Sequence, residues 1–535
     1  MMSLRVPAFL LALGLSAGGV HAAAPVWTGT WSAPVLDQQL FNNSGQPVAL
    51  GGKTVRQSFR SSIGGSQVRV RLSNLFGQQA VTVRDVHFAK AASDQAVKKS
   101  TDQVLLFGGK GSVTIQPGQQ VTSDALGFKL ARSTDYAVSL YVPDAVDFNH
   151  VTAHRQAWQT IYTAAGDVAA DPGITPVDSI GSYVFLTGVE VVDASATGAV
   201  VTLGASITDG SNTSYGANLR WGNDLALRLH DAGLEVGVLN AGLSGGQLLN
   251  DGSFGGPSAL NRFQRDVLSQ AGVKWVISSD TAINDLSGHS NGHGQTDGSG
   301  PSFAQLSGAT QQLIAQAHAA GVTFLCSTLT PNVGRDPNSW TPTAESIREQ
   351  LNAWYRTPES GCDGIVDQDT ATHDPAMPLQ YRPSFNAGDF LHPNDAGTQA
   401  IADAINLGFF EKNGLPPVAA STSCGTLLPG EGLRKKQSLL SCDGRFQLAL
   451  QADSNLVLSF GATVLWSTNT AGQHASEFTL LPDGDAVLYG SDAGVLFDTK
   501  TTGLLSTRLV VQNDGNMVVY DGAGHPLFAT NTCCH

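Results

Sequence analysis

Two segments that lie far apart in the chain hold the residue types of a nucleophilic relay. Ser206 lies in the turn 204–210, directly after the apolar run 200–203. A serine at a tight strand-to-helix turn is exposed at the carboxyl end of a sheet, where open α/β folds bind ligands. Serine is a weak nucleophile until a base takes its proton. Asp389 and His392 are spaced so that the carboxylate holds one imidazole nitrogen while the other faces the serine. The sequence therefore predicts Ser206 as nucleophile, His392 as base and Asp389 as its orienting partner.

Acyl transfer by such a relay also needs hydrogen-bond donors aimed at the developing oxyanion. The glycine turn 240–245 offers a backbone N–H, and the segment 282–285 offers the side-chain amide of Asn284. Taken singly, a Gly-x-Ser turn is usually only a turn, and an Asn-Asp pair is more often a helix cap. Four segments in this order, each after the expected element, favour a catalytic site.

The elements that must position these residues alternate between short apolar runs and helical stripes. Apolar residues recur at helical spacing around 221–229, 260–267, 306–317 and 347–354. Strand-like runs occupy 200–203, 236–239, 275–277, 322–325 and 365–366. Such alternation predicts βαβ units and a mainly parallel sheet that is covered on both faces.

The chain before this region alternates with a period of two. Val68, Val70 and Leu72 share one face of a predicted strand, and glycine or proline turns separate further runs of this kind up to residue 192. Several short strands with turn signals between them predict an all-β sandwich.

The chain after residue 424 repeats itself. The segment 451–459 matches 512–520, and a degenerate copy lies at 481–489. A spacing of about 30 residues between copies implies three similar β units around a pseudo-threefold axis.

The four segments of the central region resemble the conserved blocks of SGNH (GDSL-type) hydrolases, whose named residues are Ser, Gly, Asn and His. Upstream, 67–77 and 186–189 resemble the β-domain that precedes the catalytic domain in one secreted branch of that family. The resemblance implies an α/β/α, flavodoxin-like catalytic domain and an acyl-enzyme mechanism. It also implies an oxyanion hole formed by the Gly245 N–H, the Asn284 amide and the Ser206 N–H.

Three departures from the family pattern surround this site. The residue before the nucleophile is Ala205 where the family has Asp, and the Asn block begins with Ala282 in place of Gly. The predicted strand 276–281 is one residue longer than the pattern and carries polar residues at 278–280. The missing Asp should leave the nucleophile intact, because that side chain is outside the proton-transfer chain. A displaced Asn284 would remove one oxyanion donor, which typically costs about 10²–10³ in turnover.

The C-terminal repeats resemble the mannose-binding site of bulb-type (monocot) lectins, over about 424–532. In the motif Gln-x-Asp-x-Asn-x-Val-x-Tyr, the polar side chains hydrogen-bond vicinal sugar hydroxyls, Val packs on the ring and Tyr closes the site. The resemblance implies a β-prism in which the middle copy, having lost Gln and Asn, only scaffolds. The alternative is a prism that has lost its sugar affinity. The implied sugar-binding residues are Gln512, Asp514, Asn516, Val518 and Tyr520 in the third copy, and Gln451, Asp453 and Asn455 in the first.

The N-terminus predicts a signal peptide. Arg5 precedes the apolar run 6–20, and a small-residue cleavage site follows at 20–22. The run is shorter than the ~20 residues of a spanning helix, so a membrane anchor is the weaker interpretation. We therefore expect a secreted or periplasmic protein without an integral membrane segment.

These boundaries divide the chain of 535 residues into five parts. They are a signal peptide at 1–22, a β-sandwich domain at 25–193, a catalytic domain at 196–413, a linker at 414–423 and a lectin-like domain at 424–535.

The six cysteines make disulfides plausible in an exported chain. Cys326 ends one predicted strand and Cys362 precedes the next, so parallel strands would place them at opposite ends of the sheet, which argues against pairing. The remaining four could staple the C-terminal domain, with their connectivity open: Cys424, Cys442, Cys533 and Cys534.

The loop 288–294 contains His289 and His293. Two histidines with no carboxylate or cysteine at ligand spacing are weak evidence for a metal, and a solvent-exposed loop is the better interpretation. We expect no catalytic metal and no cofactor.

The charge balance helps to define the partner. The chain has 44 acidic and 30 basic residues and a formal charge of −14, which offers no positive surface for nucleic acid.

The resulting hypothesis is a secreted carboxylic-ester hydrolase acting on a small ester or an acylated, for example acetylated, polysaccharide. Its C-terminal domain would bind a mannose-type glycan. The alternatives are a lipase acting on lipid esters and a glycan-binding adhesin whose hydrolase domain is inactive.

Overall fold

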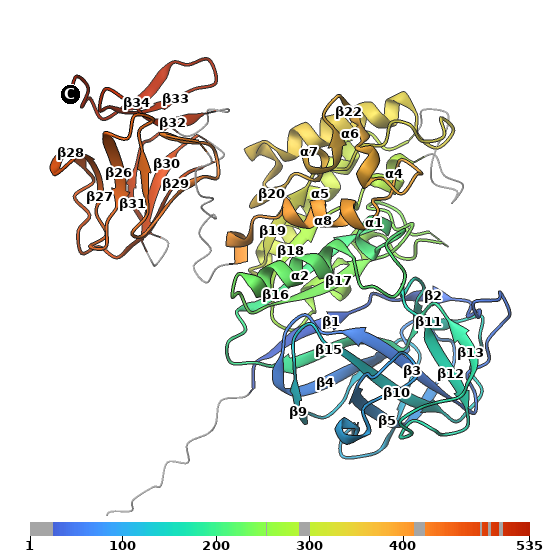
Figure 1. The fold of residues 1–535 in the computed structure, drawn as a ribbon. Coiled ribbons are helices and arrows are strands. Elements are labelled where there is room, and N and C mark those ends of the chain that lie inside the picture. The colour runs from blue at the N-terminus through green and yellow to red at the C-terminus, as the bar shows by residue number, and fades with distance from the viewer. Residues whose placement is uncertain are drawn as a thin grey trace, which may run out of the picture.

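The computed structural model describes residues 25–252, 254–287, 300–410, 423–481, 484–490, 494–501 and 507–535. The predicted signal peptide, most of the predicted linker, the loop with His289 and His293, and Asp483 of the middle repeat lie outside these residues. The chain forms an N-terminal β region (residues 25–197), a central α/β region (198–410) and a C-terminal β region (423–535) (Figure 1). Each β region has one main buried core, and the central region has two. This confirms the predicted multidomain arrangement, with β-rich regions on both sides of an α/β region.

Antiparallel strands make up the N-terminal β region. β4 buries Val68, Val70 and Leu72, as its period of two requires. One sheet has the order β1-β15-β4-β8, with β9 also paired to β4: β1 (Trp27–Ser32), β15 (Leu186–Val192), β4 (Gly65–Ser73), β8 (Gln120–Thr122) and β9 (Leu126–Leu130). A larger sheet contains β13 (Pro176–Ile180), β12 (Ile161–Ala165), β3 (Lys53–Arg60), β10 (Asp135–Val142), β5 (Val81–Lys90), β6 (Gln103–Val104) and β7 (Ser112–Ile115). A small sheet joins β14 (Tyr183–Val184), β11 (Val151–His154) and β2 (Leu36–Gln38).

The central α/β region is built on a parallel sheet. Its order is β17 (Val236–Gly242), β16 (Gly198–Gly204), β18 (Val273–Ser278), β19 (Thr323–Ser327) and β20 (Gly364–Val366). In β16, Val201 and Leu203 face one core, while Val200 faces the other. Both faces of the sheet are therefore covered, as the alternation of strands and helices predicts.

Helices supply the two covering layers. Residues of α3, α5 and α6 pack in the first core, and residues of α2 and α8 pack in the second. The helices are α1 (Ser206–Asp209), α2 (Trp221–Asp231), α3 (Ala259–Phe263), α4 (Ile283–Leu286), α5 (Phe303–Ala319), α6 (Pro342–Tyr355), α7 (Gln368–Thr372) and α8 (Asp395–Asp403). A short hairpin of β21 (His373–Asp374) and β22 (Met377–Tyr381) lies between α7 and α8.

The N-terminal β region covers the edge of this sheet. β1 lies along β17 (Figure 1), and a Cβ on Gly237 would lie 2.0 Å from the carbonyl oxygen of Gly29, so only glycine allows the two backbones to approach this closely. Ser32 Oγ donates to the Asn240 carbonyl at 2.8 Å, and the Val238 N–H donates to a serine of the N-terminal β region. The edge strand is thus shielded by a neighbouring part of the same chain.

Within its described residues, the C-terminal β region forms three four-stranded antiparallel sheets, one for each sequence repeat. The first contains β25 (Ser438–Leu440), β26 (Phe446–Leu450), β27 (Leu456–Phe460) and β28 (Thr463–Ser467). The second contains β24 (Gly432–Arg434), β29 (Ala475–Leu480), β30 (Ala486–Gly490) and β31 (Val495–Asp498). The third contains β23 (Thr426–Leu427), β32 (Arg508–Val511), β33 (Met517–Tyr520) and β34 (Pro526–Ala529). All three contribute leucine, phenylalanine and other apolar side chains to a shared core.

Two disulfides are present, and one corrects a prediction. Cys326 and Cys362 are bonded, with their Cα atoms 5.7 Å apart, although the sequence argued against this pair. β20 is short and begins opposite Leu325, so the residues just before it lie beside Cys326 and not at the far end of the sheet. Cys362 also packs against the same core as Cys326. In the C-terminal β region, Cys424 is bonded to Cys442, and the remaining two cysteines are exposed thiols.

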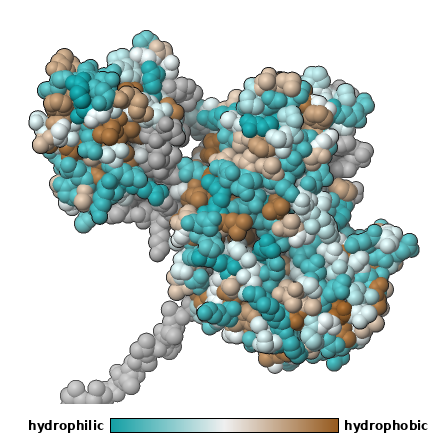
Figure 2. All heavy atoms as spheres, in the orientation of Figure 1, coloured by the Kyte–Doolittle hydropathy of each residue, from teal (hydrophilic) through white to brown (hydrophobic). Residues whose placement is uncertain are grey.

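The visible surface is mixed in character. On the face shown in Figure 2, apolar residues are scattered among polar ones. Among the residues that the structure describes, no helix has both the length and the apolar character needed to cross a membrane.

Candidate active site

Ser206 is the first residue of α1 and follows β16 after a single alanine. The turn is tight. A Cβ on Gly204 would lie 2.0 Å from Thr208 Oγ1 and 2.2 Å from Asp280 Oδ1, so glycine is required there. Ser206 is 6% exposed at the carboxyl end of the sheet, where the sequence places it.

The three residues predicted to form the relay meet in space. His392 Nε2 lies 2.8 Å from Ser206 Oγ, and His392 Nδ1 lies 2.6 Å from Asp389 Oδ2. These distances lie within hydrogen-bonding range although 186 residues separate the serine from the histidine. The arrangement allows the imidazole to take the serine proton on one side while the carboxylate holds it on the other.

Asp389 is fixed as an ionised partner for the histidine. Partial burial alone would raise its pKa, but hydrogen bonds from the His392 ring and from the backbone amides of His392 and Leu391 outweigh burial and hold the pKa of Asp389 well below its usual range. Asn212 Nδ2 also donates to Asp389 Oδ2 at 3.1 Å. Sequence reasoning missed Asn212, whose backbone lies in the left-handed region at φ 66° in the loop after α1.

Two of the predicted oxyanion donors lie on neighbouring elements, Gly245 in a turn and Asn284 on α4. Gly245 has φ 78°, and a Cβ there would lie 2.4 Å from the ring of Phe254, so both conformation and space require glycine. Asn284 Nδ2 donates to the carbonyl oxygen of Gly246 at 2.9 Å, which brings the Asn284 side chain to the Gly245 turn.

Asp285, the neighbour of Asn284, anchors the continuation of this turn. Its carboxyl oxygens accept hydrogen bonds from the N–H groups of Leu248 at 2.7 Å and Leu249 at 3.0 Å. Burial raises the pKa of Asp285 to about 7, and the two backbone hydrogen bonds only partly oppose that effect. Consecutive residues of α4 therefore bond to the turn that contains Gly245 and to the residues that follow it.

The approach to α4 differs from the sequence prediction. The predicted strand 276–281 is wrong, because β18 ends at Ser278 and the chain turns over residues 279–282. This turn places Asp280 against the backbone on both sides of Ser206. Its carboxylate accepts hydrogen bonds from the N–H groups of Ala205 at 2.9 Å and Ile207 at 2.8 Å, and from Thr208 Oγ1 at 2.6 Å. Sequence reasoning noted Asp280 only as a polar residue in an unusual place.

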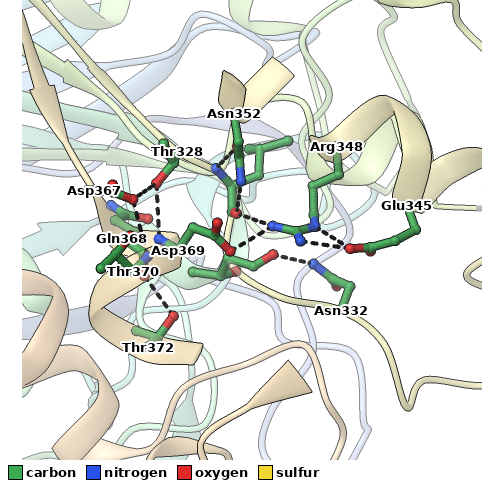
Figure 3. Close-up of polar contacts among 12 residues, drawn as sticks. Thr328, Asn332, Glu345, Arg348, Asn352, Asp367, Gln368, Asp369, Thr370 and Thr372 are labelled. Atoms are coloured by element: carbon green, nitrogen blue, oxygen red, sulfur yellow. Dashed lines mark hydrogen bonds and ion pairs between the residues drawn. The ribbon is translucent and has the colours of Figure 1, made fainter. Parts of the chain in front are cut away.

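A buried polar network supports this turn from behind. Ser279 and Gln368 are hydrogen-bonded at 2.9 Å, and Gln368 is the first residue of α7. The next residue of α7, Asp369, accepts a hydrogen bond of 2.8 Å from the buried guanidinium of Arg348, which also bonds to a glutamate on its own helix (Figure 3). Ser279, just after β18, thus has a hydrogen-bond partner on α7, and Arg348 in turn bonds to α7.

Arg262 joins the ends of β16 and β17, the strands that lead to Ser206 and to the Gly245 turn. It is 2% exposed and donates to the carbonyl oxygens of Gly204 at 2.9 Å and Ala241 at 2.6 Å. Burial lowers the pKa of the guanidinium, and the nearby Asp266 carboxylate opposes that effect. Both strand ends are therefore anchored to α3.

In the C-terminal β region, the Asn position of each repeat has a structural contact in common. Asn455, Asp485 and Asn516 each accept hydrogen bonds at Oδ1 from two threonines of the adjoining strand end. The threonine pairs are Thr468 and Thr470, Thr499 and Thr501, and Thr530 and Thr532.

The third copy also brings Gln512 and Tyr520 together. Gln512 Nε2 donates to the Tyr520 hydroxyl at 2.8 Å, and Asp514 Oδ1 accepts from the Asn516 N–H at 3.0 Å. In the first copy, Asp453 Oδ1 accepts from the Asn455 N–H at the same distance. In the third copy the predicted sugar-contacting residues therefore lie on β33 and in the turn before it, and in the first copy they all lie in the turn before β27.

Comparison with known proteins identifies the central α/β region. Residues 200–405 match the family model of GDSL-like lipases/acylhydrolases. The chain therefore contains a GDSL-type acylhydrolase domain and is a serine ester hydrolase. No curated protein matches the chain.

Solved structures resemble parts of the chain. A lectin from Marasmius oreades is 31% identical, over 21% of this chain and 93% of its own, with a TM-score of 0.20. The mannose-specific agglutinin of snowdrop (Galanthus nivalis) bulbs, complexed with methyl-α-D-mannoside, is 31% identical over 18% of this chain and 88% of its own, with a TM-score of 0.17. An acylhydrolase-like protein from Bacteroides fragilis is 19% identical over 38% of this chain and 83% of its own, with a TM-score of 0.28.

Proposed function

We propose that this protein is an extracytoplasmic carboxylic-ester hydrolase that works through an acyl-enzyme on Ser206. The observation that carries the proposal is the continuous chain of short contacts from Ser206 Oγ to His392 and from His392 to Asp389. A triad is recognised by this geometry and not by sequence position.

The proposed reaction has two halves. His392 Nε2 takes the proton of Ser206 Oγ as the oxygen attacks the ester carbonyl, and then gives that proton to the departing alcohol. In the second half a water molecule takes the place of the serine, and the same histidine again acts first as base and then as acid. Asp389 holds the ring in the tautomer that presents Nε2 to the serine and stabilises the imidazolium that forms.

The tetrahedral oxyanion would bind to the Gly245 N–H, the Asn284 amide and the Ser206 N–H. Two features of the structure support this assignment. Asn284 already contacts the turn that contains Gly245, and the backbone on both sides of Ser206 is fixed by Asp280. Preorganised donors of this kind are worth about 10²–10³ each in turnover.

The substrate class we propose is an acylated carbohydrate. The C-terminal β region supports this choice because its three-sheet repeat presents Gln512, Asp514, Asn516 and Tyr520 together, as a prism-like lectin with a mannose-type site would. The first copy would offer a second site through Gln451, Asp453 and Asn455. Two disulfides support an extracytoplasmic location, since such bonds persist in oxidising compartments.

The test is hydrolysis of p-nitrophenyl acetate, butyrate and octanoate by the mature protein, with Ser206→Ala and His392→Ala alongside. We expect the wild type to hydrolyse these esters. Each variant should lose turnover by about 10³-fold or more, as the removal of a triad residue does in other enzymes. A preference for acetate would support the carbohydrate-ester substrate, whereas a preference for octanoate would replace it with a lipid ester. Turnover that survives in Ser206→Ala would contradict the mechanism.

Covalent labelling distinguishes the ester hydrolase from a glycan-binding adhesin with an inactive hydrolase domain. An active-site phosphonate should react with the wild-type protein at Ser206 and not with Ser206→Ala. An inactive glycan-binding protein would not react in either form.

A further inference from the structure

The N-terminal β region contributes a buried histidine to the surroundings of the nucleophile. His154, the last residue of β11, is 3% exposed, and its Nε2 lies 3.0 Å from Asp209 Oδ1 on α1. Its Nδ1 lies 2.8 Å from the carbonyl oxygen of Pro34. Both ring nitrogens thus have an oxygen partner, so the His154 ring is held in one orientation between Pro34 and Asp209.

Asp209 also bonds to the oxyanion turn, so it links His154 to that turn. It lies three residues after Ser206, on the same helical turn. Its second oxygen, Oδ2, accepts hydrogen bonds from the N–H of Ser244 at 3.0 Å and from Ser244 Oγ at 2.7 Å. Ser244 immediately precedes Gly245. The two hydrogen bonds to Asp209 hold Ser244 in place, and this fixes the peptide plane that carries the Gly245 N–H.

The residue after His154 reaches the same turn from another direction. Arg155 donates to the carbonyl oxygen of Phe254, and its guanidinium lies 3.6 Å from the centroid of the Phe254 ring. That ring packs directly on Gly245, where a Cβ would lie 2.4 Å from it. An aromatic ring held by a cation therefore covers the turn on its outer side.

Arg220 links the same segment to α1. Arg220 Nη2 donates to the carbonyl oxygen of Ala157, and Arg220 Nε donates to the carbonyl oxygen of Asp209, both at 2.6 Å. Residues 154–157, which we call the bridging segment, thus contact α1 directly through His154 and indirectly through Arg220, and they reach the oxyanion turn through Phe254.

We propose that the bridging segment is a positioning element of the active site, and that His154 sets the direction of the Gly245 N–H through Asp209 and Ser244. This inference rests on the proposed function, because it uses Gly245 as an oxyanion donor. The N-terminal β region then does more than shield the edge of the parallel sheet: it completes the catalytic geometry. A misplacement of about 1 Å at a reacting group costs about 10² in rate.

The first experiment measures His154→Gln and His154→Ala with p-nitrophenyl acetate. We expect kcat to fall about 10- to 100-fold, with KM changed less than about threefold, because the donor acts on the transition state more than on the bound ester. We also expect weaker inhibition by phenylboronic acid, in proportion to the fall in kcat/KM, because its tetrahedral adduct uses the same donors. Unchanged kcat and unchanged boronate affinity would overturn the proposal.

His87→Gln is the matched control. His87 belongs to the same N-terminal β region, is similarly buried, and forms its own pair with Asp102 at 2.9 Å. Its loss should lower the melting temperature and leave kcat and boronate affinity as in the wild type. If His87→Gln lowers kcat as much as His154→Gln does, general destabilisation explains both, and the proposal is wrong.

Ser244→Ala keeps the proposal testable if the His154 variants fold poorly, since it removes only a hydroxyl. We expect it to lower kcat and boronate affinity together. Combined with His154→Gln, its effect should be less than multiplicative, because both changes act on one carboxylate. Fully multiplicative effects would contradict the route through Asp209. Turnover that persists in Ser206→Ala would instead defeat the proposed function itself, which separates the two failures.

Discussion

Asp280 Oδ2 accepts a hydrogen bond of 2.8 Å from the backbone N–H of Ile207, the residue that follows the proposed nucleophile. Asp280 Oδ1 accepts another from the N–H of Ala205, the residue that precedes it. The Ser206 N–H lies between these two N–H groups and is one of the proposed oxyanion donors. Because Asp280 fixes the peptide groups on both sides, it also orients the Ser206 N–H. The chain therefore places a carboxylate beside this turn although residue 205 is alanine.

Replacing Asp280 should damage both the site and the fold. Asp280→Ala leaves two buried N–H groups and one hydroxyl without their acceptor, at about 1–3 kcal/mol for each unsatisfied group. We expect a large fall in melting temperature and at least about a 10-fold fall in kcat. Asp280→Asn keeps one acceptor oxygen and should lie between Asp280→Ala and the wild type. Steady-state kinetics and thermal unfolding measure both effects.

The control for Asp280→Asn is Asp336→Asn. Asp336 is exposed and also accepts a backbone N–H, that of Asn338, at 3.0 Å. The same chemical change should there leave kcat and melting temperature close to the wild-type values. An Asp280→Asn protein that matches the wild type in both measurements would show that the carboxylate does not hold the nucleophile turn.

Asp285 should make the protein less stable as pH rises from about 4 to about 7. Its pKa is raised to about 7 in the folded chain, mainly by burial, whereas an unfolded aspartate titrates near ~3.9. Between these values the folded state binds a proton that the unfolded state has lost, so the free energy of unfolding falls as pH rises, and it levels off above the folded pKa. At about 1.4 kcal/mol for each unit between the two pKa values, the contribution is at most about 4 kcal/mol.

Asp285→Asn removes this titration and should flatten the dependence of unfolding free energy on pH in that range. Asp224, whose pKa is also raised to about 7 by burial, has the same sign and leaves a residual slope. Asp389 has a lowered pKa, so its stabilisation is present above the unfolded value and is lost only at more acid pH. Urea unfolding at pH 4.5, 6 and 7.5 measures the slope, and equal slopes for wild type and Asp285→Asn would contradict the prediction.

The sequence predicted those parts of the site that depend on local order. A period of two or of 3.6 residues locates the strand ends, and the Asp-x-x-His spacing places Asp389 beside His392 because both lie on one loop. Ser206 and Asn284 follow because residues after parallel strands share one edge of the sheet.

The remaining parts depend on contacts between distant segments and have no local signature. Asp280 contacts residues about 75 positions earlier, and His154 contacts Asp209 from a different region of the chain. The pairing of Cys326 with Cys362 depends on how the turn before β20 folds over the sheet, which strand positions alone do not specify.

That disulfide should stabilise the central α/β region. The double variant Cys326→Ser, Cys362→Ser opens a loop between residues 36 positions apart, and native disulfides of this kind contribute about 2–4 kcal/mol. We expect the urea midpoint to fall accordingly. Replacing the exposed thiols Cys533 and Cys534 with serine should change stability by no more than about 0.5 kcal/mol. Equal midpoints for the wild type and the Cys326/Cys362 double variant would contradict the prediction.

The sugar-binding prediction has an internal control, because the middle repeat has an aspartate where the other two have asparagine. Asp485 Oδ1 accepts from Thr499 and Thr501 just as Asn516 Oδ1 accepts from Thr530 and Thr532. Asn516→Asp should therefore keep these structural contacts while replacing the amide N–H donors with a carboxylate that cannot donate to a sugar hydroxyl.

We expect Asn516→Asp to reduce binding of methyl α-mannoside at the third repeat by at least about 10-fold, with the melting temperature unchanged. A lost charged or neutral hydrogen bond to a ligand commonly costs about 1–3 kcal/mol, and 1.4 kcal/mol is a factor of ten. Isothermal titration calorimetry of the wild type, Asn516→Asp, Asn455→Asp and the double variant would assign the two sites. Loss of binding only in the double variant would show that both repeats bind sugar independently. Undiminished binding in the double variant would place the sugar elsewhere.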